Sequence, residues 1–221
     1  DEPAQVLRVL GLGATAPCDV QVAAAITKGR RGEELAPLGE LFDVGVRVFT
    51  DDGACVADAG LMRRALQYAT ALPGAVVAQH CEEPSLAAGG HMHEGEWSGR
   101  LGLAGVPAEA ESIIVARDIA LARCAGARVH FLHLSTAQAI ELVGMARQVG
   151  VRVSCEVAPH HFTLTDEACA GYDPVFKVSP PLRPRADVDA VRAALADGTV
   201  DAIATDHAPH AAHRKDQPFE D

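Results

Sequence analysis

Short apolar segments alternate along the chain with longer segments in which apolar residues recur every three or four positions. The short segments predict buried β-strands, and the longer ones predict amphipathic helices. The predicted strands are residues 20–27, 46–50, 75–78, 129–134, 151–157 and 200–204. The predicted helices are residues 33–44, 59–72, 107–125, 136–149 and 186–196, preceded by a short helix and a turn within 3–16. Loop or irregular structure is expected for residues 89–100 and 163–184.

This alternation of strand and helix, without long hairpins, is typical of βαβ units, so we expect a parallel sheet. A doubly wound sheet usually has a Gly-rich phosphate loop after its first strand. Gly11-Leu-Gly13 is too weak a match to count as such a loop. Residues of metal-ligand type recur instead where strands end, which favours a barrel whose strands converge on one mouth.

Composition and charge exclude some classes of protein. The chain has 221 residues, 48% of them hydrophobic, which is enough for one domain with a substantial core. The net charge of −11 argues against a nucleic-acid-binding protein, which would need a basic face. No apolar run approaches the roughly 20 residues of a membrane span. The six scattered cysteines form no Cys-x-x-Cys pair and are typical of reduced thiols in a cytosolic protein.

Candidate metal ligands follow four of the predicted strands: Asp52, His80, His133 and Asp206. In a parallel barrel the carboxyl ends of the strands meet at one mouth, so these side chains would lie close together. Imidazole and carboxylate groups are ligands that Zn²⁺ accepts in catalytic sites. A carboxylate can also bridge two metal ions in a hydrolytic site. The pattern therefore predicts a metal site built from four strand ends.

Strand geometry selects among neighbouring candidates, because successive side chains point to opposite faces. Asp51 and Asp52 face opposite ways, so only one of them can be a ligand. His130 and His133 are three positions apart and also face opposite ways. If His133 faces the interior of the barrel, His130 faces the helices.

Each candidate has a simpler interpretation. A single buried histidine is more often a hydrogen-bonded core residue than a ligand, and the residues around Asp52 taken alone resemble a turn. His91 and His93 are interpreted as solvated loop residues, and His160 and His161, which follow a proline, are left unassigned. We favour one shared site, because four independent coincidences at four strand ends are improbable.

Six short motifs support this interpretation and occur in order along nearly the whole chain: Phe49-Thr-Asp-Asp-Gly53, Gln79-His-Cys-Glu-Glu83, His130-Phe-Leu-His-Leu-Ser135, Cys155-Glu-Val-Ala-Pro-His-His161, Ser179-Pro-Pro-Leu-Arg183 and Ala204-Thr-Asp-His-Ala-Pro-His210. Together they resemble the bacterial dihydroorotases of the amidohydrolase superfamily. Related hydantoinases and allantoinases usually carry a carboxylated lysine on the fourth barrel strand. The Asp-Asp-Gly motif is similar to that of the dihydroorotase branch that uses aspartate instead.

The resemblance implies a (β/α)8 TIM-type barrel with a binuclear zinc site. It implies that Asp52 bridges the two zinc ions and that His80 and His133 hold the second. It further implies that Asp206 holds the first zinc and acts as the catalytic general acid and base, while His210 contacts substrate.

The resemblance also implies an activity, the interconversion of dihydroorotate and N-carbamoyl-L-aspartate in cytoplasmic pyrimidine biosynthesis. One alternative is another cyclic amidohydrolase, similar to a hydantoinase or an allantoinase. A second alternative is a catalytically silent scaffold that binds aspartate carbamoyltransferase. The implied partners are the small-molecule substrate and either a second copy of the chain or that carbamoyltransferase. No nucleic acid and no membrane is expected.

Two departures from the family pattern qualify these expectations. The family's opening His-x-His strand, its following strand, its C-terminal substrate loop and its small β-domain have no counterpart here. We therefore expect residues 1–221 to be a single, incomplete barrel domain with about strands 3–8, to bind about one zinc equivalent, and to be a weak catalyst alone. The second departure is Ser179, which stands where the family usually has a substrate-binding asparagine.

Overall fold

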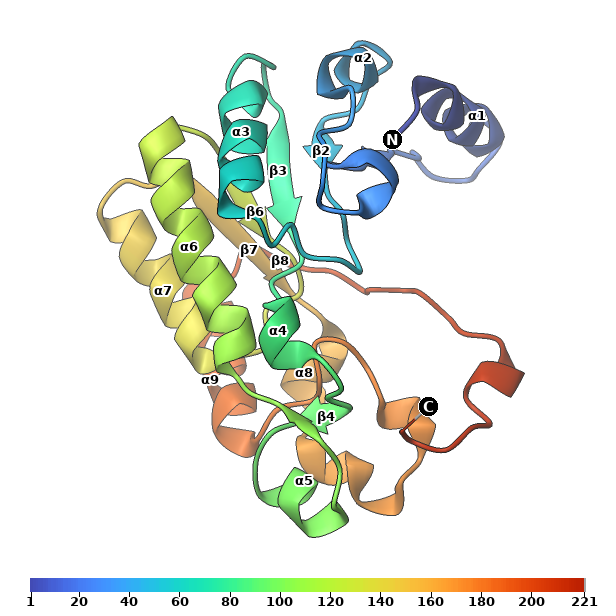
Figure 1. Cartoon of the computed structure of the whole chain (residues 1–221), viewed down its shortest axis with the longest axis vertical. Helices are drawn as coiled ribbons and strands as arrows, with labels where there is room; N and C mark the ends of the chain where they lie inside the picture. The colour runs from blue at the N-terminus through green and yellow to red at the C-terminus, as the bar shows by residue number, and fades with distance from the viewer. Residues whose placement is uncertain (221) are drawn as a thin grey trace. The chain divides into compact units, whose positions relative to one another are not determined.

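The computed structural model describes residues 1–220, and its main sheet has six strands in the order β1-β2-β3-β6-β7-β8 (Figure 1). The strands are β1 (Ala23–Ala24), β2 (Val48–Phe49), β3 (Val76–Gln79), β6 (Val129–Phe131), β7 (Val153–Val157) and β8 (Ala202–Ile203). The pairs β1–β2, β2–β3, β3–β6 and β7–β8 are all parallel. The predicted α/β class and all six predicted strands are therefore confirmed, although the strands are shorter than predicted.

Helices follow the strands along the chain, as the periodicity predicted. They are α1 (Pro3–Gly13), α2 (Leu38–Asp43), α3 (Ala59–Ala69), α6 (Glu109–Ala125), α7 (Ala137–Gln148) and α9 (Arg185–Asp197). Local sequence sets several of their ends. The Asp58 side chain caps α3 by accepting a hydrogen bond from the Leu61 amide, and Gly198 ends α9 in the left-handed conformation. In the described part of the chain, no helix is both long and apolar enough to cross a membrane.

The chain divides into two compact units. The first unit contains residues 1–80, 117–131 and 146–153, and the remaining described residues form the second. In the first unit, Phe49 of β2 pairs with Val77 of β3, and Val77 pairs with Val129 of β6. This register places the carboxyl ends of the strands at one edge of the sheet, which is where α/β proteins carry their functional residues.

The second unit contains a small module that the sequence pattern did not predict. Residues 89–100 were expected to be a loop, but they contribute β4 (Met92–His93) and most of α5 (Glu96–Leu101), and β5 (Gly105–Val106) pairs with β4 in parallel. Met92 packs in a buried cluster with Leu103, Cys169 and Phe219. The prediction was wrong because glycine and histidine dominate the local pattern, whereas the apolar partners come from distant segments.

Short helices also occur outside the predicted helices. The short helices are α4 (Pro84–Ala87), α8 (Pro159–Thr163) and the 3-10 turns η1 (Lys28–Arg30), η2 (Asp166–Gly171), η3 (Pro174–Phe176) and η4 (Ala212–Arg214). Two of them, η2 and η3, lie within residues 163–184, which were expected to be irregular.

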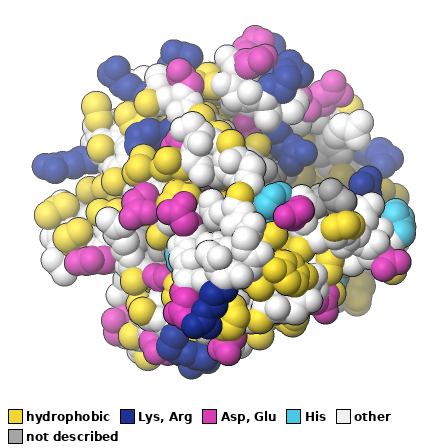
Figure 2. All heavy atoms as spheres, turned by 60° about the horizontal axis from the view of Figure 1, so that its bottom comes forward, with side chains coloured by type: hydrophobic (Ala, Val, Ile, Leu, Met, Phe, Trp, Pro, Cys, Tyr) yellow, Lys and Arg dark blue, Asp and Glu magenta, His cyan; other side chains and the backbone are white. Residues whose placement is uncertain are grey.

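On the face drawn in Figure 2, Lys and Arg side chains are dispersed among acidic and hydrophobic ones and do not gather into a broad basic patch.

Candidate metal centre

Asp51 and Asp52 follow β2 and have different roles. Asp51 is buried, and its carboxylate accepts hydrogen bonds from the amides of Ile26 at 2.8 Å and Thr27 at 3.0 Å and from the Thr27 hydroxyl. It therefore ties the end of β2 to the segment after β1. The Asp52 side chain is 42% exposed, and its Oδ1 lies 3.4 Å from Nδ1 of His80. Asp52 is thus the carboxylate of the pair that is accessible to a ligand.

His80 follows β3 at a strand end that a buried polar network fixes. The preceding residue, Gln79, donates to Asp118 of α6 at 3.1 Å and accepts from the Val56 amide at 3.3 Å. Arg117 donates to the same Asp118 carboxylate at 2.8 Å. Burial raises the pKa of Asp118, and the bonds from Arg117 and Gln79 oppose that rise. A network of this kind limits where the His80 imidazole can lie.

His133 follows β6 in a tight turn and is buried. Its backbone φ of 33° is in the left-handed region that few residues other than glycine adopt. Such conformations persist where the surrounding structure holds them. Here Ser135 and Thr136, which follow His133 and Leu134, donate amide and hydroxyl hydrogen bonds to the buried Glu111 carboxylate.

Asp52, His80 and His133 each offer a ligand atom, and these atoms all lie within 4.8 Å of one another. One carboxylate oxygen and two imidazole nitrogens are a donor set that suits Zn²⁺ and similar divalent cations. The residues therefore fit a metal ion by chemistry and by spacing. His130, which the strand alternation had set aside, is not a member of this group.

The other predicted site residues lie outside that group of three. Asp206 and His210 are exposed in the segment after β8, and Asp206 has a left-handed φ of 49°. Ser179 is exposed, and its hydroxyl donates to Glu82 at 3.2 Å. The roles assigned to these three residues remain predictions.

His160 is a candidate that the sequence reasoning left unassigned. Its Nε2 is buried and has no hydrogen-bond partner among the described residues. Burial lowers the pKa of His160, nearby Asp206 raises it, and His133 lowers it further. The neighbouring His161 bonds to the Pro180 carbonyl at 3.0 Å, so it is the structural member of the pair. The available signal was position, because this pair follows β7 as the other candidates follow their strands.

Arg30 is a second residue that the sequence reasoning missed. Its Nη1 donates to the Asp52 carbonyl at 2.8 Å, and it lines a hollow of about 390 Å³ together with Gly29, Thr50 and Asp52.

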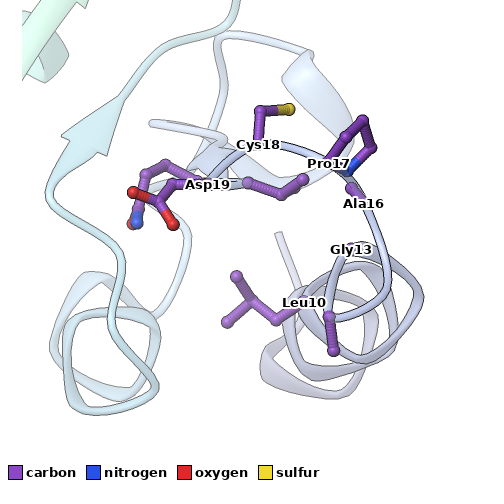
Figure 3. Close-up of a pocket in the computed structure, with 9 residues that line it drawn as sticks. Leu10, Gly13, Ala16, Pro17, Cys18 and Asp19 are labelled. Atoms are coloured by element: carbon purple, nitrogen blue, oxygen red, sulfur yellow. The ribbon is translucent and has the colours of Figure 1, made fainter.

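A larger hollow of about 490 Å³ lies between α1 and the loop that follows it, lined by Leu10, Gly13, Pro17, Cys18 and Asp19 among others (Figure 3). The larger hollow contains none of the candidate ligands.

A parallel α/β sheet with candidate metal ligands at the carboxyl ends of its strands is typical of the barrel class of α/β proteins. Solved structures confirm the fold. L-hydantoinase (dihydropyrimidinase) from Arthrobacter aurescens gives a TM-score of 0.82 at 22% identity over 99% of this chain and 50% of that one. Dihydroorotase from Saccharomyces cerevisiae, solved in complex with 5-fluoroorotic acid, gives 0.72 at 19% identity over 97% and 60%.

Sequence comparison gives the particular family. Residues 7–139 match the family model described as dihydro-orotase-like, and the chain belongs to this family. The dihydroorotase of Pelotomaculum thermopropionicum is 54% identical over 220 residues, which cover 100% of this chain and 51% of the relative. The chain thus spans about half the length of the curated relatives it matches.

Proposed function

We propose that this chain is part of a zinc-dependent cyclic amidohydrolase that interconverts dihydroorotate and N-carbamoyl-L-aspartate. The observation that carries the proposal is the Asp52, His80 and His133 group in a chain of the dihydro-orotase-like family. A cyclic amide is stable in water, so its opening needs an activated water and a polarised carbonyl. A divalent cation bound by these residues would supply both.

The proposed zinc complement is two ions in a complete site, of which Asp52, His80 and His133 would hold one. Asp52 would also reach the other ion, because its carboxylate has two oxygens and its side chain is 42% exposed. Asp206 would be a ligand of that other ion. Asp206 and the unpartnered Nε2 of His160 supply further polar groups after neighbouring strands, consistent with a second position.

The chain's own residues would move the proton and hold the substrate. Asp206 would accept a proton from the attacking water and deliver it to the ring nitrogen as that nitrogen leaves. His210 and Ser179 would contact the substrate through hydrogen bonds. Dihydroorotate is an anion, and Arg30, which bonds to the Asp52 carbonyl, would add a positive charge close to the bridging carboxylate.

We also propose where the protein acts and what it assembles with. We place the protein in the cytoplasm, where pyrimidine precursors are made, and propose assembly either with a second copy or with aspartate carbamoyltransferase. A catalytically silent scaffold is less well supported, because the Asp52, His80 and His133 group retains metal-ligand chemistry and spacing.

One alternative activity has a specific observation in its favour. A hydantoinase-like specificity is supported by Ser179 in place of an amide side chain. A solved dihydropyrimidinase from Brevibacillus agri is also 26% identical over 83% of this chain and 43% of that one, with a TM-score of 0.67.

The deciding experiment compares dihydroorotate and hydantoin as substrates of the zinc-loaded protein, with Asp206→Asn as the matched control. We expect slow, zinc-dependent interconversion of dihydroorotate and N-carbamoyl-L-aspartate, because this chain is expected to be a weak catalyst alone, and the control should lose this activity. Faster turnover of hydantoin would favour the alternative. Zinc binding without turnover of either ring would favour the scaffold.

A further inference from the structure

Arg183 is one of the largest fully buried side chains of the second unit, with only 2% of its surface exposed. Its guanidinium is engaged on three sides. Nε donates to the Ser135 hydroxyl at 2.9 Å, Nη1 donates to Nδ1 of His93 at 3.1 Å, and Nη2 lies 3.9 Å from Oε2 of Glu111. Burial of a charge is costly unless the charge is paired and hydrogen-bonded. These three partners meet that requirement for Arg183.

Glu111 also binds the turn after β6 that contains Ser135. It is 1% exposed and accepts hydrogen bonds from the amides of Ser135 at 3.1 Å and Thr136 at 2.9 Å. The hydroxyls of both residues also donate to it, at 2.5 and 2.7 Å. The Ser135 hydroxyl therefore accepts from Arg183 while it donates to Glu111, which joins the two buried charges through one atom.

The protonation of His93 fits this arrangement. Arginine can only donate, so Nδ1 of His93 must be the acceptor and must carry no proton. Burial and the adjacent Arg183 lower the pKa of His93 to about 4, so the imidazole is neutral at pH 7. His93 was predicted to be a solvated loop residue, and that prediction is wrong because β4 buries it against Arg183.

We propose that Arg183 is a positioning residue of the metal centre, acting through Ser135 and Glu111 on the turn that presents His133. This inference rests on the proposed function. His133 lies two residues before Ser135, so the atoms that fix Ser135 also limit the direction of the His133 imidazole. Arg183 also lies four residues after Ser179 in the same segment, so one buried cation connects the metal-ligand turn to the segment expected to contact substrate.

A positioning role for Arg183 predicts a change in metal affinity, whereas a purely structural role predicts a change in stability alone. Arg183→Lys keeps the positive charge but cannot reproduce the three-sided fork of the guanidinium. Loss of a partner that orients a metal ligand typically weakens metal binding by about 10- to 100-fold. We expect Arg183→Lys to weaken zinc binding by that factor. Arg185→Lys, an exposed arginine at the start of α9, is the matched control and should leave the dissociation constant unchanged.

The test is a competition titration of zinc with a chromophoric chelator, made on the 221-residue chain and its variants. The absorption spectrum of the cobalt-loaded chain reports the ligand geometry independently of catalysis, and it should differ between Arg183→Lys and Arg185→Lys. Thermal unfolding of each metal-free variant measures the purely structural effect. A lowered melting temperature with unchanged zinc affinity and cobalt spectrum would overturn the positioning role and leave the proposed function intact. Failure of the unaltered chain to bind zinc would overturn both.

Ser135→Ala keeps the proposal falsifiable if Arg183→Lys folds poorly, because this variant should weaken zinc binding by itself; unchanged zinc affinity in folded Ser135→Ala would contradict the proposal. Where both variants fold, a double-mutant cycle gives a further test. Ser135→Ala removes only the hydroxyl that joins Arg183 to Glu111. If Arg183 acts through this hydroxyl, the combined effect of both changes on zinc affinity should be smaller than the product of the separate effects. Independent, multiplicative effects would contradict the proposal.

Discussion

Asp51 and Asp52 are adjacent carboxylates with different surroundings, so replacing each by asparagine should separate fold stability from metal binding. Both changes keep the size of the side chain and remove its charge. Asp51 is buried and bonded to the segment after β1, whereas Asp52 is half-exposed beside His80. We expect Asp51→Asn to act on stability and Asp52→Asn to act on zinc.

The magnitude for Asp51 follows from its three hydrogen bonds, two from the backbone amides of Ile26 and Thr27 and one from the Thr27 hydroxyl. A hydrogen bond to a charged acceptor contributes about 1.5–3 kcal/mol, and a neutral one contributes about 0.5–1.5 kcal/mol. Removing the charge therefore costs about 1 kcal/mol per bond, and about 3 kcal/mol in total.

The corresponding cost for Asp52 is smaller. Its Oδ1 accepts from the Gly53 amide at 2.8 Å and lies 3.4 Å from His80, but water screens a side chain that is 42% exposed. Pairs of this kind contribute about 0–1 kcal/mol. Asp52→Asn should therefore cost about 1 kcal/mol or less in the metal-free chain.

Two measurements check this pair of variants. Denaturant unfolding of the metal-free chain gives the free energy of unfolding, and chelator competition gives the zinc dissociation constant. We expect Asp51→Asn to retain zinc affinity. Asp52→Asn removes a ligand, so it should weaken zinc by more than the about 10- to 100-fold that loss of a supporting partner costs. A folded Asp51→Asn variant that no longer binds zinc, beside an Asp52→Asn variant that does, would refute the assignment.

Ser179, His93 and Phe219 can each be tested by a single substitution. Ser179→Asn should raise the ratio of activity on dihydroorotate to activity on hydantoin several-fold, because one added hydrogen bond contributes ~1 kcal/mol. An unchanged ratio in steady-state kinetics would show that Ser179 does not contact substrate. The pKa of His93 is lowered to about 4, so its neutral form stabilises the fold above pH 6.5 and that stability is lost as the pH falls toward 4. Unfolding titrations of His93→Gln should show a shallower loss over this range. Phe219→Ala should cost about 3–5 kcal/mol of unfolding free energy, because Phe219 is 3% exposed in an apolar cluster.

Much of the fold could be predicted because patterns within short segments of the sequence specify its strands and helices. Short apolar segments with intervening amphipathic helices specify βαβ units, and all six main strands occur where the pattern placed them. The choice between Asp51 and Asp52 was narrowed by the two-residue period of a strand. The hydrogen bonds of Asp51 to the segment after β1 then show that Asp51 has a structural role.

The rest depends on partners far apart in the sequence. Met92 is buried by Cys169 and Phe219, so the pattern around Met92 alone does not indicate a strand. Arg183 and His93 form a contact across 90 residues, and neither residue is unusual in its own segment. His160 could have been noticed by its position after β7, but its burial comes from the fold.

The central claim is that Asp52, His80 and His133 hold a metal ion, and a crystal structure of the chain grown with zinc tests it most directly. Diffraction data collected at the zinc absorption edge identify the metal by its anomalous signal. We expect a peak about 2.0–2.2 Å from a carboxylate oxygen of Asp52 and from one imidazole nitrogen of each histidine. A peak bound by Asp51 or His130 in their place, or no peak in a zinc-saturated crystal, would contradict it.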